Sequence, residues 1–82
     1  MAQIEDRQIE DMESIPLRIG RRVHDERRRQ GMDQRTLAMV SNVAVRSVHR
    51  VEHGEQTVRM DVLLRILAAL GLRLDVHGHG GV

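Results

Sequence analysis

The feature that most constrains the fold is a pair of short apolar-spaced segments within DQRTLAMVSNVAVRSVHRVEHG, residues 33–54. Asp33 is a good N-cap for the first segment, and Gly54 is a natural stop for the second. Helices of about two turns are marginal in water, so both must pack against the rest of the chain. Asn42, between them, tolerates the left-handed conformation that a tight turn requires. The stretch is therefore predicted to be two helices joined by a tight turn.

Periodicity predicts further helices on either side of this stretch. Pro16 suits the first turn of a helix that Gly31 would end, so we expect a first helix over residues 16–30. The run RMDVLLRILAALG, residues 59–71, has a broad apolar face and is expected as one helix or as a short turn plus a longer helix. The predicted core is formed by Leu17, Ile19, Val23, Leu37, Ala38, Val43, Val48, Val51, Met60, Leu63, Leu64, Leu67 and Leu70.

After Gly71 the pattern changes to the alternation of a strand, predicted over residues 72–77. A single strand in a helical chain leaves its backbone N–H and C=O groups without a ladder, which favours pairing with the same strand of a second copy. The glycine-rich residues 78–82 are expected to be a flexible tail. The expected dimer contacts are Leu72, Arg73, Leu74, Asp75 and Val76.

Composition narrows the class of protein. The chain has 82 residues, which suits one small domain, and its lack of cysteine excludes disulfides and thiolate metal sites. No apolar run approaches the roughly 18 residues of a membrane span, and the start lacks a signal peptide, so we expect a cytoplasmic protein. The absence of aromatic residues removes the stacking platforms used to bind single strands and RNA loops.

Charge is divided unevenly along the chain. Residues 1–14 hold five acids against one arginine, a net of −4, and are expected to be a mobile leader. The rest of the chain, beginning with the folded domain of residues 15–71, has a net charge of +5. All thirteen basic residues are arginine, which suits phosphates and guanine edges but also arises from a GC-rich genome. A basic body suggests a polyanionic partner, although such a charge also serves solubility.

The second helix of the pair has two different faces. Val48 and Val51, three residues apart, face the core. The opposite face is polar near the start of the helix, where an arginine can bind guanine and a serine can bind phosphate. This arrangement predicts a recognition helix for double-stranded DNA. The residues expected to face outward are Val45, Arg46, Ser47, His49 and Arg50, with Arg46 as the main base reader.

With these features in place, GMDQRTLAMVSNVAVRSVHRVEHGE followed by LLRILAALGL resembles the helix-turn-helix of the Xre and lambda-repressor-like family. That family has a glutamine opening helix 2, a Leu-Ala pair, a tight turn and a closing Ile/Val-Glu-x-Gly. The strand that follows narrows the likeness to HipB-type antitoxins, the partners of HipA-type kinase toxins. The matching positions are Gln34, Leu37, Ala38, Val43, Val48, Val51, Glu52 and Gly54.

The resemblance implies an all-α, five-helix lambda-repressor-like domain with a short C-terminal β-strand that pairs in a dimer. It implies an ion pair between Arg27 and Glu52, and a phosphate contact by Gln34 at the start of a helix. Neighbouring Arg35, and Arg59 near the last helix, are further candidate DNA contacts. One departure is Ala44, which stands where the family has a capping Ser or Thr.

The expected function is sequence-specific binding of a palindromic operator by a dimer that represses its own operon, as a HipB-like antitoxin with a HipA-like kinase as second partner. The alternatives are a stand-alone Xre-type repressor and a protein-interaction module for which DNA is secondary. We expect no enzyme activity, because no nucleophile, base and acid form a set. His49 and His53 share a helix face without a third ligand, so we expect no metal and no cofactor.

Overall fold

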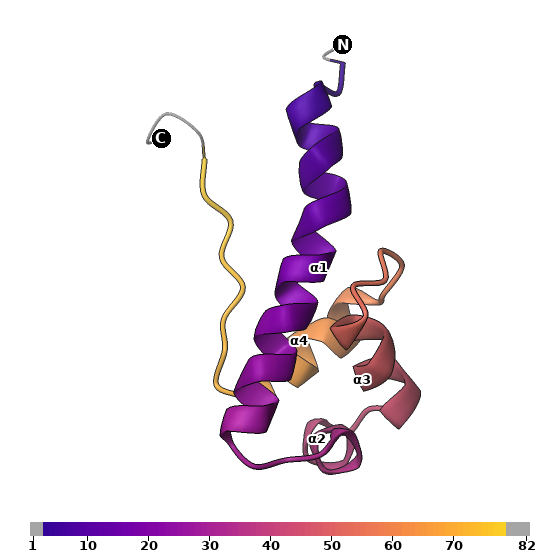
Figure 1. Cartoon of the computed structure of the whole chain (residues 1–82), viewed down its shortest axis with the longest axis vertical. Coiled ribbons are helices and arrows are strands. Elements are labelled where there is room, and N and C mark those ends of the chain that lie inside the picture. The colour runs from indigo at the N-terminus through magenta and orange to yellow at the C-terminus, as the bar shows by residue number, and fades with distance from the viewer. Residues whose placement is uncertain (1–2, 79–82) are drawn as a thin grey trace.

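The computed structural model describes residues 3–78, and over that range it contains four helices. Figure 1 shows the three shorter helices gathered around the C-terminal half of the long first helix, whose N-terminal half extends clear of them. No helix in the described range is long and apolar enough to cross a membrane. The helices are α1 (Asp6–Arg29), α2 (Gln34–Ser41), α3 (Val45–Glu52) and α4 (Met60–Ala69).

Helix α1 begins at Asp6, so the expected start at Pro16 is wrong, and residues 6–14 are helical instead of a separate leader. The Gln8 side chain accepts a hydrogen bond of 2.9 Å from the backbone N–H of Glu5, which caps the new start. Acids in the first turns also suit the positive end of the helix dipole. Pro16 lies inside the helix, where it can donate no bond to the carbonyl of Met12.

The N-cap of α2 and the turn between α2 and α3 have the geometry that the sequence predicts. The Asp33 carboxylate accepts a 2.7 Å bond from the Thr36 N–H, and this backbone bond lowers the pKa of Asp33. Asn42 has φ 57° and ψ 49°, the left-handed conformation that turns the chain into α3. Ala44 precedes α3 without a side-chain cap, as its methyl group requires. The predicted N-cap and turn are confirmed.

The core lies where α2, α3 and α4 meet the C-terminal half of α1. Its buried apolar side chains include most of the predicted ones. The prediction is wrong for Leu17, Met60 and Leu64, which are 58%, 59% and 47% exposed. Gly20 lets α1 approach α3 closely, since a Cβ there would stand 2.4 Å from the Val51 carbonyl oxygen. The fully or nearly buried set is Val23, Leu37, Ala38, Val48, Val51, Ile66, Leu67 and Leu70.

Two expected elements do not appear in residues 3–78. There are four helices instead of five, because the loop before Met60 forms no additional helical turn. Residues 72–78 contain no strand; the chain leaves α4 with a 2.8 Å bond from the Leu72 N–H to the Leu67 carbonyl and then runs without regular structure. A strand requires a ladder partner, and the single described chain offers none. Beyond Gly78, the predicted flexible tail lies outside the described residues.

Candidate DNA-binding surface

The C-terminal end of α3 is fixed by a buried ion pair with α1. The Arg27 guanidinium donates two bonds to the Glu52 carboxylate, Nε to Oε2 at 2.6 Å and Nη2 to Oε1 at 3.0 Å. The two side chains are only 8% and 4% exposed. Hydrogen bonding to Glu52 raises the pKa of Arg27, and a third bond reaches the Met32 carbonyl at 2.9 Å. This pair joins α1, α3 and the segment leading into α2.

Gln34, expected to contact phosphate, is turned inward in the structure. Its Nε2 donates to Glu52 Oε1 at 3.2 Å, and the residue is half-buried. Its amide therefore adds a third hydrogen bond to the buried Glu52 carboxylate, beside the two from Arg27. The neighbouring Arg35 is exposed, and its side chain makes no hydrogen bond or ion pair within residues 3–78. On α2, Arg35 is thus the side chain free to reach an anion.

The outer face of α3 is open to solvent, as the sequence predicts. Val45 is 45% exposed, and Arg46 and His49 are exposed as well. In the described part of the chain, the Arg46 side chain has no hydrogen-bond or ion-pair partner. Beneath them, Val48 and Val51 are 0% and 4% exposed, so the helix is held by its inner face. A free guanidinium on a fixed helix is suited to binding a ligand.

Three other predicted DNA contacts surround a hollow of about 100 Å³ beside α3. Half-buried Ser47 and Arg50 line it on α3, and Arg59 lines it from the start of α4. Arg50 is not free, because it pairs with Glu55 and donates to the Thr57 carbonyl at 2.8 Å. These bonds hold the loop that follows α3 against the helix.

Arg59 is also paired, though on the surface. Its Nε and Nη2 donate to the two carboxylate oxygens of Asp61, each at 3.1 Å. The two side chains are 81% and 50% exposed. An exposed pair of this kind exchanges readily with water and salt, so Arg59 can turn to an incoming phosphate at little cost.

His49 and His53 stack on the exposed side of α3, with ring centroids 4.0 Å apart. The Nδ1 atom of His53 lies 2.8 Å from the His49 carbonyl oxygen and can donate to it. No group of three or more His, Cys, Asp or Glu that could hold a metal ion occurs among the described residues.

The sequence reasoning missed two side chains, Arg65 and Gln30, whose hydrogen bonds support this surface. Arg65 of α4 donates to the Asn42 carbonyl at 3.4 Å, which ties α4 to the turn before α3. Gln30 donates to the Leu70 carbonyl at 3.0 Å and to Glu26 at 2.8 Å, joining the ends of α1 and α4. Hydrogen bonds from Arg29, Gln30 and Arg22 lower the pKa of Glu26 to about 2. The partners of Glu26 lie three or four residues away along the sequence, whereas only helix packing reveals the bonds to Leu70 and Asn42.

The residues expected to form a dimer strand lie mainly in solvent. Leu72 is half-buried against the core, whereas Leu74 is 39% and Val76 94% exposed. Arg73 and Asp75, between them, are exposed too. The described chain therefore leaves the apolar side of this segment largely uncovered.

Comparison with known families agrees with this geometry. A family model described as helix-turn-helix matches residues 23–77, which include the inner ion pair, the turn and the exposed face of α3. The chain belongs to the helix-turn-helix family. It is accordingly a DNA-binding regulator of transcription, and the match supports the Xre and lambda-repressor-like resemblance. No curated protein and no solved structure gives a significant match to the chain.

Proposed function

We propose that this helix-turn-helix protein is a sequence-specific repressor that binds a palindromic operator as a dimer and represses its own operon. The observation that carries the proposal is the outer face of α3, where Arg46 is free and exposed while Val48 and Glu52 anchor the helix beneath it. A helix fixed on one side and open on the other can enter the major groove and read guanine through arginine.

Arg35, Ser47 and Arg59 are the proposed phosphate contacts around this helix. Arg35 is free at the start of α2, and Ser47 and Arg59 share one hollow beside α3. Phosphate contacts position the protein without reading sequence. Gln34 and Arg50 are assigned a supporting role, because their side chains are already bound within the domain.

The experiment is a selection of binding sites from random duplexes, followed by titrations at several salt concentrations. We expect an inverted repeat whose half-site centres are about 34 Å or a multiple apart, and affinity that falls steeply with salt as phosphate counterions are released. A chain truncated after Gly71 should bind the full repeat far more weakly. Affinity that is independent of both sequence and salt would contradict the proposal.

The narrower proposal is a HipB-like antitoxin whose second partner is a HipA-like kinase toxin. It rests on the alternating segment after α4 and on the exposed apolar residues Met39 and Val40, which are 76% and 58% exposed on α2 and offer a surface for a protein. Co-purification with the product of the neighbouring reading frame tests it. If that neighbour encodes no kinase, the stand-alone repressor is the better description.

A further inference from the structure

A single apolar stripe runs along α1 through Ile9, Met12, Pro16, Ile19 and Val23, at alternating spacings of three and four residues. This spacing keeps the side chains on one face of a helix. Val23 is fully buried, but Ile9 and Met12 are 44% and 59% exposed. The face that builds the core in one half of α1 is therefore left open, within the described residues, in the other half.

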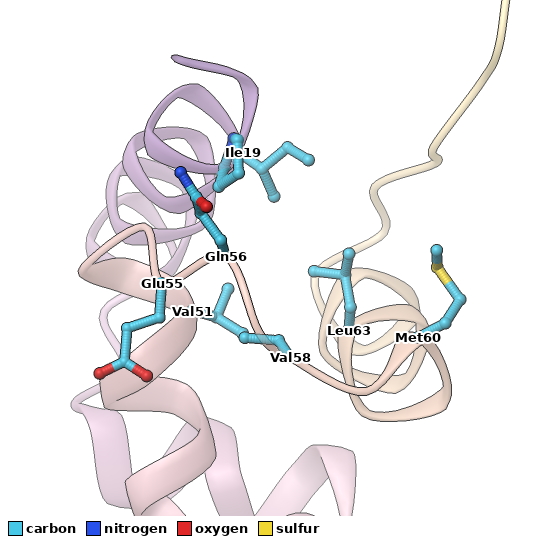
Figure 2. Close-up of a pocket in the computed structure, with 8 residues that line it drawn as sticks. Ile19, Val51, Glu55, Gln56, Val58, Met60 and Leu63 are labelled. Atoms are coloured by element: carbon cyan, nitrogen blue, oxygen red, sulfur yellow. The ribbon is translucent and has the colours of Figure 1, made fainter. Parts of the chain in front are cut away.

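The open half of the stripe leads into a hollow of about 160 Å³ between α1, α3 and α4. Figure 2 shows Ile19 on α1 and Leu63 and Met60 on α4 around this space. A second hollow is lined by Met12 and shares Pro16 with the first. These two hollows and the open stripe form one surface, called here the α1–α4 apolar surface: Ile9, Met12, Pro16, Ile19, Met60 and Leu63.

The C-terminal segment, residues 72–78, is a second feature whose apolar side chains are left uncovered in the described chain. Figure 1 shows it running from the end of α4 toward the end of the molecule where α1 begins. In Figure 2 it leaves on the side of α4 that lies away from α1. Its Val76 is 94% exposed, and beyond the Leu72 N–H its backbone makes no hydrogen bond in the described chain. It therefore has both an uncovered apolar face and an unpaired backbone.

These two uncovered features fit each other when a second copy is present. A ladder of two strands is marginally stable by itself and needs a helix to pack on. We propose that the α1–α4 apolar surface receives the C-terminal segment of a second copy, which pairs with the first copy's own segment. A partner strand would lie about 4.8 Å from that segment, on the side that faces α1. The inference rests on the dimer proposed above and names the surface that supports it.

Charge argues against the other way of covering this surface with a second copy, which is to pair the N-terminal halves of two α1 helices. Residues 1–14 have a net charge of −4, so two such segments side by side would repel. The C-terminal segment avoids this repulsion, because Leu72, Leu74 and Val76 alternate with Arg73 and Asp75 and give it one uncharged face. An apolar strand is therefore the better occupant.

The absence of native cysteine allows a direct cross-linking test on the full-length chain. Chains carrying Met12→Cys are mixed with chains carrying Val76→Cys, allowed to exchange subunits and mildly oxidised. We expect a disulfide-linked heterodimer to form at least about tenfold faster than in the control mixture of Met39→Cys with Val76→Cys, because a disulfide requires Cα atoms within about 7 Å. Equal rates in the two mixtures would overturn the inference.

Leu74→Cys alone separates this inference from the proposed dimer. If Leu74→Cys forms a rapid homodimeric disulfide while the Met12 and Val76 mixture matches the control, the strand dimer stands and its proposed seat on α1 is wrong. If neither link forms, both ideas fail. A third chain carries both Met12→Cys and Val76→Cys. If its disulfide forms only within one chain, and never between chains, the chain's own segment folds back onto α1, which also overturns the inference.

A second measurement avoids cysteine chemistry. Met12→Asp should weaken dimerisation in sedimentation experiments by at least about tenfold, since it places a charge under the apolar strand. Met39→Asp, at a position that is also solvent-exposed but lies on α2, should leave dimerisation unchanged. Because Met12 is exposed in the single chain, both variants should keep the parent's helix content by circular dichroism. A dimer unaffected by Met12→Asp would overturn the inference.

Discussion

The inner and outer faces of α3 use charged side chains in opposite ways. On the inner face, the Glu52 side chain is 4% exposed and accepts hydrogen bonds from Arg27 and Gln34. On the outer face, Arg46 is exposed and has no partner in the described chain. The inner charge is committed to holding three helices together, and the outer charge remains available to a ligand. Changes on the two faces should therefore appear in different measurements.

The largest expected effect follows from removing the inner charge. Glu52→Gln should lower the free energy of unfolding by about 3 kcal/mol, because it leaves the Arg27 guanidinium buried without its counter-charge. The measurement is chemical denaturation monitored by circular dichroism. Glu55→Gln is the matched control: it breaks the exposed pair with Arg50, with side chains 48% and 41% exposed, and should cost under about 1 kcal/mol. Equal losses of unfolding free energy in the two variants would contradict the expected difference between the buried and the exposed ion pair.

The next effect concerns the outer face and should leave stability unchanged. Arg46→Ala should weaken binding by about 1 to 3 kcal/mol at one operator position and flatten the base preference there, since a bidentate contact to guanine is lost. Titrations over single-base operator variants measure this. Arg35→Ala, which removes a proposed phosphate contact, should instead weaken binding to every variant about equally. If the base preferences of Arg46→Ala match those of the parent, Arg46 does not read a base.

The smallest effect is a pH dependence of the protein's stability that arises from Glu26 of α1. Because hydrogen bonds from Arg29, Gln30 and Arg22 lower the pKa of Glu26 from 4.5 to about 2, its folded-state interactions favour the ionised form. The stabilisation is present above pH 4.5 and is lost as the pH falls from about 4.5 to 2. Thermal melts of the parent should therefore fall more steeply over this window than those of Glu26→Gln. Asp33, whose pKa is also lowered, is retained in both proteins. Parallel pH profiles would contradict the assignment.

What the sequence by itself determined was local backbone geometry and the division of α3 into two faces. Asp33 caps α2 and Asn42 makes the left-handed turn, because each depends on its own side chain and backbone. Val48 and Val51 are buried, because a helical period with few apolar positions allows only one inward face. The early start of α1 also had local signals in Glu5 and Gln8, but they compete with Pro16, which is unfavourable inside a helix.

Only the tertiary structure decided which long side chains are already occupied. Gln34 and Arg50 have the residue types and positions of DNA contacts, yet Glu52 and the Thr57 carbonyl hold them within the domain. Met60 has the spacing of a core residue, yet it is 59% exposed, because no described segment covers that side of α4. A long side chain can reach several partners from one backbone position, and the packing of distant segments selects among them. Periodicity assigns a residue to a face of its helix, whereas the neighbouring helices determine what that face meets.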